Sequence, residues 1–262
     1  MPLRILANRN RSGAYLIMLV LATAMFGLFF FLTIFVQDVL GYSALKAGVA
    51  FLPLAGTIVV VSGIVSQLIS RTGARPLMLA GPALTAGGMF WFAQVGVHTT
   101  YLAGLLGPSL VTGAGLGLLF VPLSLVALAH VRDQDSGLAS SLLNTGQQVG
   151  GAIGLAALGT VAWTVVASSA RSQIATAAAA ASQSGHTLRM KAGSPLPASI
   201  YHHALAAGIS RGLLAASGVA LAALIIAVVT IRVRREELTG DSAAAGPGQS
   251  ASAAPAMAPA GS

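Results

Sequence analysis

Six long apolar runs limit what this chain can fold into. Each is long enough for a helix to cross a hydrocarbon core of about 30 Å, which takes roughly 20 residues. Segments of alternating polarity, typical of outer-membrane barrels, are absent from the sequence, which leaves helices to satisfy the backbone within lipid. The sequence therefore predicts an all-α membrane protein, a six-transmembrane-helix bundle over residues 13–231. The runs cover approximately 13–36, 45–69, 76–97, 102–130, 137–167 and 203–231.

Composition supports a lipid environment. Only 8% of the residues are charged and 55% are hydrophobic, whereas a soluble domain carries about 25% charged residues. The formal net charge of +8 would suggest a nucleic-acid partner in a soluble protein. Here the basic residues cluster at the ends of the apolar runs, and no basic face with interleaved aromatic residues is present. We therefore expect the lipid bilayer as a partner, and no nucleic acid.

The distribution of Lys and Arg predicts the orientation, because the richer side of a membrane protein is cytoplasmic. With an even number of helices, both termini lie on that side of the cell membrane. Residues 1–12 are then a cytoplasmic segment, and 168–202 an external loop with at most a short helix in its alanine tract. Residues 232–262 are a cytoplasmic tail, disordered from about 240. The richer side carries Arg4, Arg9, Arg11, Arg71, Arg75, Arg132, Arg232, Arg234 and Arg235, and the other Lys46, Arg171, Arg189 and Lys191.

The first apolar run also has features of a signal peptide. It follows three arginines, and Ala22-Thr23-Ala24 resembles a cleavage site. However, the run continues to Val36 and is longer than the apolar region of a signal peptide. We therefore expect a retained helix.

Small residues recur every four positions in the fifth run and, as Gly208, Gly212 and Ala216, in the last run, while the fourth run has a cluster of glycines. Close backbone approach at such residues drives helix association in lipid. The pattern fits tight packing, and it also fits faces that slide during a conformational cycle. The residues are Gly146, Gly150 and Gly154 in the fifth run, and Gly113, Gly115 and Gly117 ahead of Pro122 in the fourth.

Polar side chains inside the runs are the candidate binding residues, since such groups face a bundle interior or a cavity. Two interpretations remain open: amides that line a substrate path, and amides that only bond between helices. No carboxylate lies deep in any run; Asp38 is at the external end of the first, and Arg211 is near the external start of the last. The amides are Gln67, Gln94, Asn144, Gln147 and Gln148.

Motifs for catalysis, metals and cofactors are absent from the sequence. It has no H-E-x-x-H segment, no phosphate-binding G-x-x-x-x-G-K-[ST] loop and no cysteine. An intramembrane serine protease needs a serine and a histidine that face each other at depth, and no such pair stands out. We expect no enzyme, no metal and no cofactor.

Three motifs carry a family resemblance. Residues 35–48 (FVQDVLGYSALKAG), 71–76 (RTGARP) and 137–151 (GLASSLLNTGQQVGG) resemble segments of the fourteen-helix drug/proton antiporters, multidrug exporters of the major facilitator superfamily. The resemblance covers roughly residues 3–165 and concerns the C-terminal half of such proteins. It implies proton-coupled efflux of an amphipathic small molecule by alternating access, with protons and an N-terminal transporter half as partners.

The resemblance also implies roles for particular residues. Gln37, Gln67, Asn144, Gln147 and Gln148 would line one wall of the substrate cavity. Arg71, Gly73 and Arg75 would belong to the cytoplasmic gating loop. Ser70 stands where the family has an acid before the loop arginine, so Asp133 and Asp135 on the next cytoplasmic loop are alternative partners of Arg71. Gln147 stands where an arginine is common.

Such exporters contain two halves, and this chain resembles the second. Met1 falls where the family has a mid-protein linker, so we expect a fragment, a split gene product or a misassigned start. Two alternatives remain open. One is a non-transporting membrane fragment or assembly subunit, and the other is a homodimeric six-helix carrier.

Overall fold

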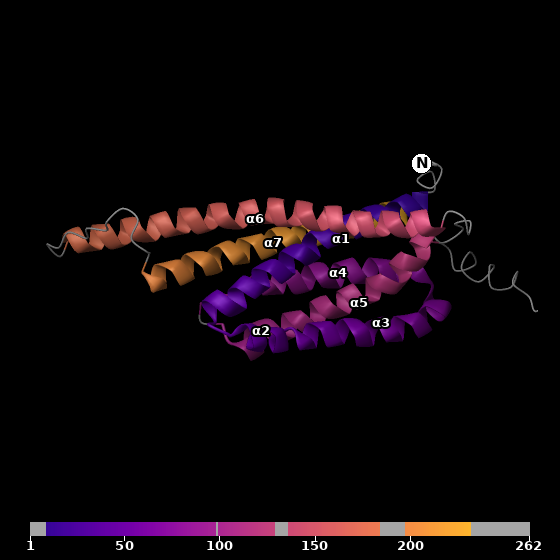
Figure 1. Cartoon of the computed structure of the whole chain (residues 1–262), viewed down its shortest axis with the longest axis horizontal. Helices are drawn as coiled ribbons and strands as arrows, with labels where there is room; N and C mark the ends of the chain where they lie inside the picture. Colours follow the sequence, from indigo (N-terminus) through magenta and orange to yellow (C-terminus); the bar gives the residue numbers. More distant parts are fainter. Residues whose placement is uncertain (1–8, 98, 129–135, 184–196, 232–262) are drawn as a thin grey trace, which may run out of the picture.

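The structure, a computed structural model, describes residues 9–97, 99–128, 136–183 and 197–231, and every regular element within these ranges is helical (Figure 1). Two short π-helical turns, η2 and η3, flank longer α-helices. In chain order the elements are α1 (Arg9–Ile34), η2 (Phe35–Val39), α2 (Ala44–Ala50), α3 (Leu52–Thr72), α4 (Ala74–Phe92), η3 (Tyr101–Leu106), α5 (Gly107–Leu128), α6 (Ser136–Gln183) and α7 (Ala198–Thr230).

Each of the six apolar runs contains a long helix, which confirms the predicted all-α membrane bundle. Five helical stretches of the described chain are long and apolar enough to span a membrane: 9–39, 44–72, 104–128, 136–180 and 198–230. The remaining helix, α4, has 19 residues and contains Arg75, two prolines and three glycines, which lower its apolarity. At about 28 Å it is close to the thickness of the core. Its span stays a prediction.

Four helices form the centre of the bundle: α1 and α4 each contact both α5 and α7. Helix α3 packs on α5, and α6 packs on α1 and α7, so these two lie at opposite edges (Figure 1). The edge position leaves α3 poorly covered. In the most apolar stretch of α2–α3, 11% of the residues are buried, against 56% for the stretch that contains α1.

Tryptophan marks one level along the bundle, which we name the Trp level. The ring of Trp91 at the end of α4 packs on Gly107, at the start of α5. Two residues further on, the Ala93 carbonyl accepts a hydrogen bond from Ser210 of α7. Trp163 of α6 belongs to the same level, since its neighbour Ala162 packs against α7 next to Ser210.

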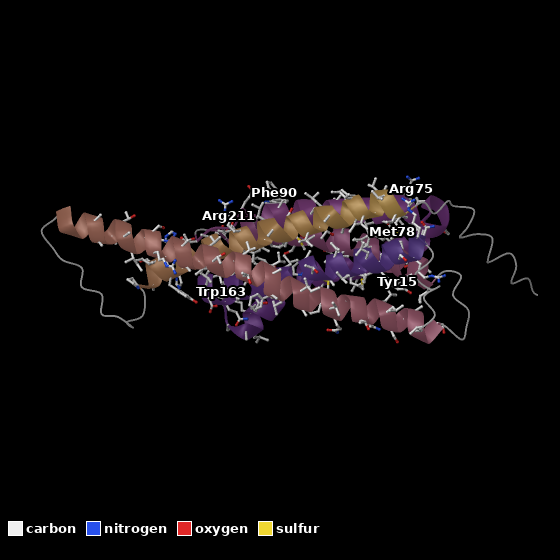
Figure 2. All side chains as sticks on the ribbon, turned by 90° about the horizontal axis from the view of Figure 1, so that it is seen from above. Tyr15, Arg75, Met78, Phe90, Trp163 and Arg211 are labelled. Carbon is white, nitrogen blue, oxygen red and sulfur yellow. The ribbon has the colours of Figure 1, made fainter. Side chains whose placement is uncertain are left out.

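Tyr15 marks the other level, which we name the Tyr15 level. Its hydroxyl lies 3.4 Å from the carbonyl oxygens of both Ala127 on α5 and Ala139 on α6. About 20 residues of α5 separate Gly107 from Ala127, which corresponds to about 30 Å of helix. Because the hydrocarbon core has that thickness, we take the two levels as the membrane boundaries. Figure 2 shows Tyr15 and Arg75 toward one end, and Trp163 and Arg211 toward the other.

Helix α6 differs from the expectation for the fifth run. The external loop was expected over 168–202 with a short helix at most, but α6 continues without a break to Gln183, and α7 begins at Ala198 rather than 203. The reason is the alanine-rich tract, because alanine has the highest intrinsic helix propensity. At 48 residues, α6 is about 72 Å long and reaches far beyond the Trp level.

Several predictions concern residues outside the described ranges. These are the tail 232–262, the first eight residues of the segment 1–12, and the loop acids Asp133 and Asp135. Residues 9–12 form the beginning of α1.

Candidate functional site

The glycines of α6 lie against the backbone of α1. A Cβ at Gly150 would collide with the Leu19 carbonyl, and a Cβ at Gly154 would lie 2.7 Å from Cα of Thr23. Gly146 is looser, with the Tyr15 carbonyl 3.9 Å from its Cβ position. The Thr23 hydroxyl donates a 2.8 Å hydrogen bond to the Gly150 carbonyl. One edge of α6 is therefore fixed closely to α1.

Two predicted cavity residues lie on the opposite side of α6. Asn144 and Gln148 each precede a packed glycine by two positions, which puts them about 160° around the helix from it. Both are exposed. The Asn144 amide donates to the Ser140 carbonyl at 3.4 Å, and Gln148 has no hydrogen-bond partner among the described residues. Gln147 lies between the α1-facing side and the opposite side of α6 and is half-buried.

Gln67 occupies a comparable position on α3. Gly113 packs on the Leu54 carbonyl and Gly117 on the Ile58 carbonyl, so α3 and α5 run parallel with one constant register. The same register puts Gln67 level with Val126, next to the Tyr15 level. Gln67 is exposed, and its side-chain amide, like that of Gln148, makes no hydrogen bond within the described part of the chain.

The five predicted cavity residues do not form one cluster. Asn144 lies about 7 Å inside the Tyr15 level, and Gln147 and Gln148 lie about 12 Å inside it, as counted along α6 from Ala139. Gln67 lies at the same end. Gln37, in η2, is about 33 Å from Tyr15 along α1 and therefore belongs to the Trp level. Helices α3 and α6 are separated by the α1–α5 pair, so four amides lie on the two edge helices toward the Tyr15 end, and Gln37 is apart from them.

The glycines of α5 pack against two neighbouring helices, α3 and α4. While Gly113 and Gly117 face α3, Gly115 faces α4, where a Cβ would lie 2.5 Å from the Thr85 nitrogen and 2.7 Å from the Gly81 carbonyl. Pro122 is buried within α5 and does not end it. Close contact on both sides places α5 between α3 and α4.

The connection between α3 and α4 is a single glycine. Gly73 has φ +79°, a left-handed conformation that favours glycine, and its N–H bonds to the Ile69 carbonyl at 2.9 Å. Arg71 and Arg75, on either side, are both exposed. The turn therefore presents two guanidinium groups at the Tyr15 end.

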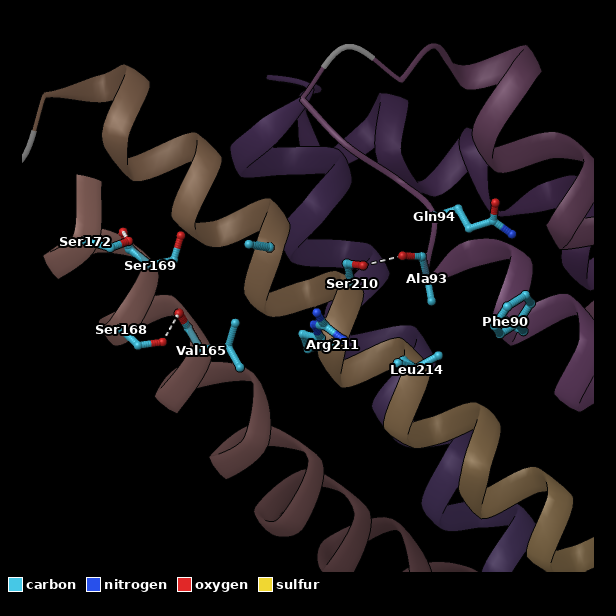
Figure 3. Close-up of a pocket in the computed structure, with 11 residues that line it drawn as sticks. Phe90, Ala93, Gln94, Val165, Ser168, Ser169, Ser172, Ser210, Arg211 and Leu214 are labelled. Atoms are coloured by element: carbon cyan, nitrogen blue, oxygen red, sulfur yellow. Dashed lines mark hydrogen bonds between the residues drawn. The ribbon is translucent and has the colours of Figure 1, made fainter. Parts of the chain in front are cut away.

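The sequence does not predict the cleft that the structure shows at the Trp level. This cleft has a volume of about 720 Å³ and lies between the end of α4 and the middle parts of α6 and α7 (Figure 3). The sequence had singled out only Gln94 and Arg211 of its lining. Its serines at 168, 169 and 172 follow helical spacing, but only the extension of α6 brings them together with Arg211. Among the described residues, no group of three or more His, Cys, Asp or Glu could hold a metal.

Comparison with known proteins gives a family and several relatives. Residues 2–155 match the profile of the Major Facilitator Superfamily. The puromycin resistance protein pur8 of Streptomyces alboniger is 37% identical over 164 residues, 62% of this chain and 33% of that protein. The cephamycin export protein CmcT of Amycolatopsis lactamdurans is 40% identical over 161 residues, 61% and 33% of the two chains.

A third relative is described as an uncharacterized MFS-type transporter, EfpA of Mycobacterium tuberculosis. It is 36% identical over 160 residues, 60% of this chain and 30% of that protein. The present chain thus spans about a third of the length of the curated relatives it matches.

Proposed function

Because the chain belongs to the major facilitator superfamily, we propose that it is the C-terminal half of an exporter that moves amphipathic organic molecules across the cell membrane by alternating access. Two relatives are named for puromycin resistance and for cephamycin export, which supports antibiotic-like substrates. The family is one of transporters, and the proposed role is transport rather than catalysis.

The observation that carries the proposal is the set of exposed amides on the two edge helices. Gln148 lies about 12 Å inside the Tyr15 level and Gln67 lies beside that level, both in apolar helices. Neither side-chain amide has a hydrogen-bond partner in the described part of the chain. An amide that faces hydrocarbon without a partner costs several kcal/mol, on the order of 4–8 by transfer to an alkane. The face between α3 and α6 therefore needs a second bundle, or a water-filled cavity, against it.

A second six-helix bundle would supply the packing partner and, between the two bundles, a water-filled cavity. In transporters of this architecture, substrate binds between two halves that rock against each other. The low burial of α3 fits a helix whose free side packs on another half. Amides on this wall can donate to and accept from a polar group of the substrate, while neighbouring exposed side chains such as Val149 and Ile153 contact its apolar part.

Coupling to protons would depend on the other half. Asp38, at the Trp level, is the only acidic residue in the described part of the chain, and it lies at the end of the first span rather than deep within it. A proton-driven cycle would thus need the titrating acids of the N-terminal half. In this half, Arg71 and Arg75 would close the cytoplasmic gate by pairing with acids, with Asp133 and Asp135 as candidates.

The orientation follows from the basic residues. Arg9, Arg11, Arg71 and Arg75 lie at the Tyr15 end, and positive residues concentrate on the cytoplasmic side. We assign the Tyr15 level to the cytoplasm and the Trp level to the outside, with both termini inside.

Expression in a drug-susceptible bacterium tests the proposal. The chain is produced alone and together with the N-terminal half of a related exporter, and accumulation of ethidium, an amphipathic cation, is followed by fluorescence. Active extrusion is expected only from the pair. Extrusion by the chain alone would exclude the half-transporter proposal. No extrusion in either case, with both halves present in the membrane, would count against transport.

The exposed face also fits a second copy of the chain. Crosslinking in membranes between single cysteines on α3 and α6 distinguishes the two arrangements, since the chain has no native cysteine. Crosslinks between identical chains would favour the homodimeric carrier. Crosslinks to the co-expressed N-terminal half would favour the two-half exporter.

A further inference from the structure

The residues that line the cleft at the Trp level are polar on its outer side and apolar on the side toward the membrane centre, along each of α4, α6 and α7. Gln94, in the turn after α4, lies outward of Phe90; on α6, Ser168 and Ser172 lie outward of Val165; on α7, Arg211 lies outward of Leu214, with the small Ala207 one turn further out. The polar residues are thus at or beyond the Trp level, and the apolar ones lie one turn closer to the membrane centre. This gradient matches a molecule with a polar head and an apolar body.

The position of Arg211 fits a membrane boundary. It is next to Ser210, whose hydroxyl bonds to the Ala93 carbonyl (Figure 3). It is also next to Gly212, which packs on Ala162 beside Trp163. Tryptophans are enriched at the headgroup level of membranes, and the chain has only two, Trp91 and Trp163. Both lie at the level of the cleft, so a guanidinium there meets lipid headgroups.

Arg211 carries a charge that the described part of the chain does not neutralise. It is exposed and has no ion-pair partner among the described residues. Five of the six acids of the sequence lie in 133–135 and 236–241, segments whose neighbouring helix ends are at the Tyr15 end. A guanidinium binds a phosphodiester through two parallel N–H donors, a stronger contact than a neutral hydrogen bond.

Other donors and acceptors line the same cleft as the guanidinium. The Gln94 amide makes no side-chain hydrogen bond among the described residues, and Ser169 accepts from Gln173 at 3.2 Å while its own proton is uncommitted. Ser168 and Ser172 donate to carbonyls of their own helix at 3.0 and 2.9 Å, and their oxygens remain acceptors. The cleft therefore offers donors for a phosphate and acceptors for hydroxyl groups.

Below the cleft, an apolar track continues along α7. Leu214, Leu221 and Ile225 share one face with Arg211, since they follow it at spacings of 3, 10 and 14 residues. They are 38%, 47% and 63% exposed. An acyl chain that extends from the cleft toward the membrane centre would lie along this face.

We propose that the cleft binds one anionic phospholipid of the phosphatidylglycerol class. Its phosphodiester lies on Arg211, Gln94 and Ser169, its glycerol hydroxyls bond to Ser168 and Ser172, and one acyl chain follows α7. Phosphatidylcholine has no hydroxyl donors in its headgroup, so it satisfies fewer of these groups. The site holds α4, α6 and α7 together in the leaflet at the Trp level, and it is independent of whether the chain transports a substrate.

Native mass spectrometry of the full chain tests the proposal. The chain is reconstituted in nanodiscs of phosphatidylcholine with increasing phosphatidylglycerol, and retained lipids are counted. One phosphatidylglycerol per chain is expected at fractions where no phosphatidylcholine is retained. Arg211→Gln should weaken this binding about tenfold, as expected for loss of a charge-assisted hydrogen-bonded pair. Gln94→Ala, which keeps the charge, should weaken it about threefold.

The matched control is Arg171→Gln. Arg171 is on α6, at the same end of the bundle as Arg211, but it does not line the cleft. It removes the same charge and should leave retention unchanged. Equal losses for the two arginine variants would show only diffuse attraction and would overturn the proposal, as would equal retention of the two lipids. Displacement by soluble glycerophosphoglycerol as strong as by the whole lipid would assign the cleft to a water-soluble phosphate instead. Circular dichroism verifies that each variant keeps its helices.

Discussion

The hydroxyl of Thr23 donates a 2.8 Å hydrogen bond to the carbonyl oxygen of Gly150, across the contact between α1 and α6. The same hydroxyl lies 3.1 Å from the Leu19 carbonyl on its own helix. This polar contact occurs where the two backbones approach most closely, because Gly150 has no room for a Cβ. Helices α1 and α6 are therefore coupled by both shape and hydrogen bonding, and they should move as one unit.

Gly150→Ala should destabilise the bundle by about 2 kcal/mol, since the added methyl meets a backbone carbonyl and the helices must separate. Thermal unfolding of the chain in detergent, followed by circular dichroism, measures the effect. Gly159→Ala on the same helix is the control, because a Cβ there meets nothing within 4 Å. It should be neutral or stabilising by roughly 0.5–1 kcal/mol. Equal melting temperatures for both variants would contradict the close contact.

Thr23→Val keeps the shape of the side chain and removes the hydroxyl. A loss of about 0.6 kcal/mol is expected, the average for hydrogen bonds between membrane helices. The comparison is Thr33→Val, since the Thr33 hydroxyl bonds only to Phe29 on its own helix. If unfolding in detergent shows the Thr33 variant to be equally destabilised, the inter-helix bond contributes nothing.

Gln148→Ala should reduce ethidium extrusion by the paired halves severalfold, because it removes an exposed amide from the proposed cavity wall. Gln67→Ala should act similarly. Gln173→Ala is the control, as it changes the same residue type on α6 beyond the Trp level. Initial rates of extrusion, normalised to the amount of protein in the membrane, give the answer. Unchanged rates for both cavity variants would remove these residues from the substrate path.

Single cysteines test the orientation directly, since the chain has none of its own. Ser172→Cys should react with a membrane-impermeant maleimide added to intact cells. Arg71→Cys should react only after the membrane is opened. The reverse pattern would invert the topology and place the lipid cleft in the cytoplasmic leaflet.

Gly73→Ala should cost about 1–3 kcal/mol, because alanine must then adopt φ +79° with ψ 169° in the one-residue turn between α3 and α4, a region essentially restricted to glycine. Gly87→Ala on α4 tests the effect of the methyl group alone, as a Cβ there has open space and φ is not positive. Melting temperatures of the two variants are compared. A Gly73 variant as stable as the Gly87 variant would show that the turn tolerates any residue.

The helices could be predicted from the sequence because apolarity and length alone determine which segments cross lipid. The end of α6 could not be predicted in this way, since residues 168–183 contain no apolar run and their helix depends on the helix propensity of alanine. Gln67, Asn144 and Gln148 were chosen by residue type as candidates for a cavity wall, and Gln37 was grouped with them although it lies about 33 Å from the Tyr15 level. Arg211 was noted alone; its cleft requires the end of α4, the body of α7 and the extension of α6.

The extension of α6 has a mechanical consequence. From Trp163 to Gln183 the helix projects about 30 Å past the membrane boundary. Because α6 is packed tightly on α1 within the membrane, this projecting segment moves with the α1–α6 unit. A tilt of about 10° of that unit displaces the end of the segment by about 5 Å. Small rotations inside the membrane thus become displacements in water that a pair of spin labels can measure.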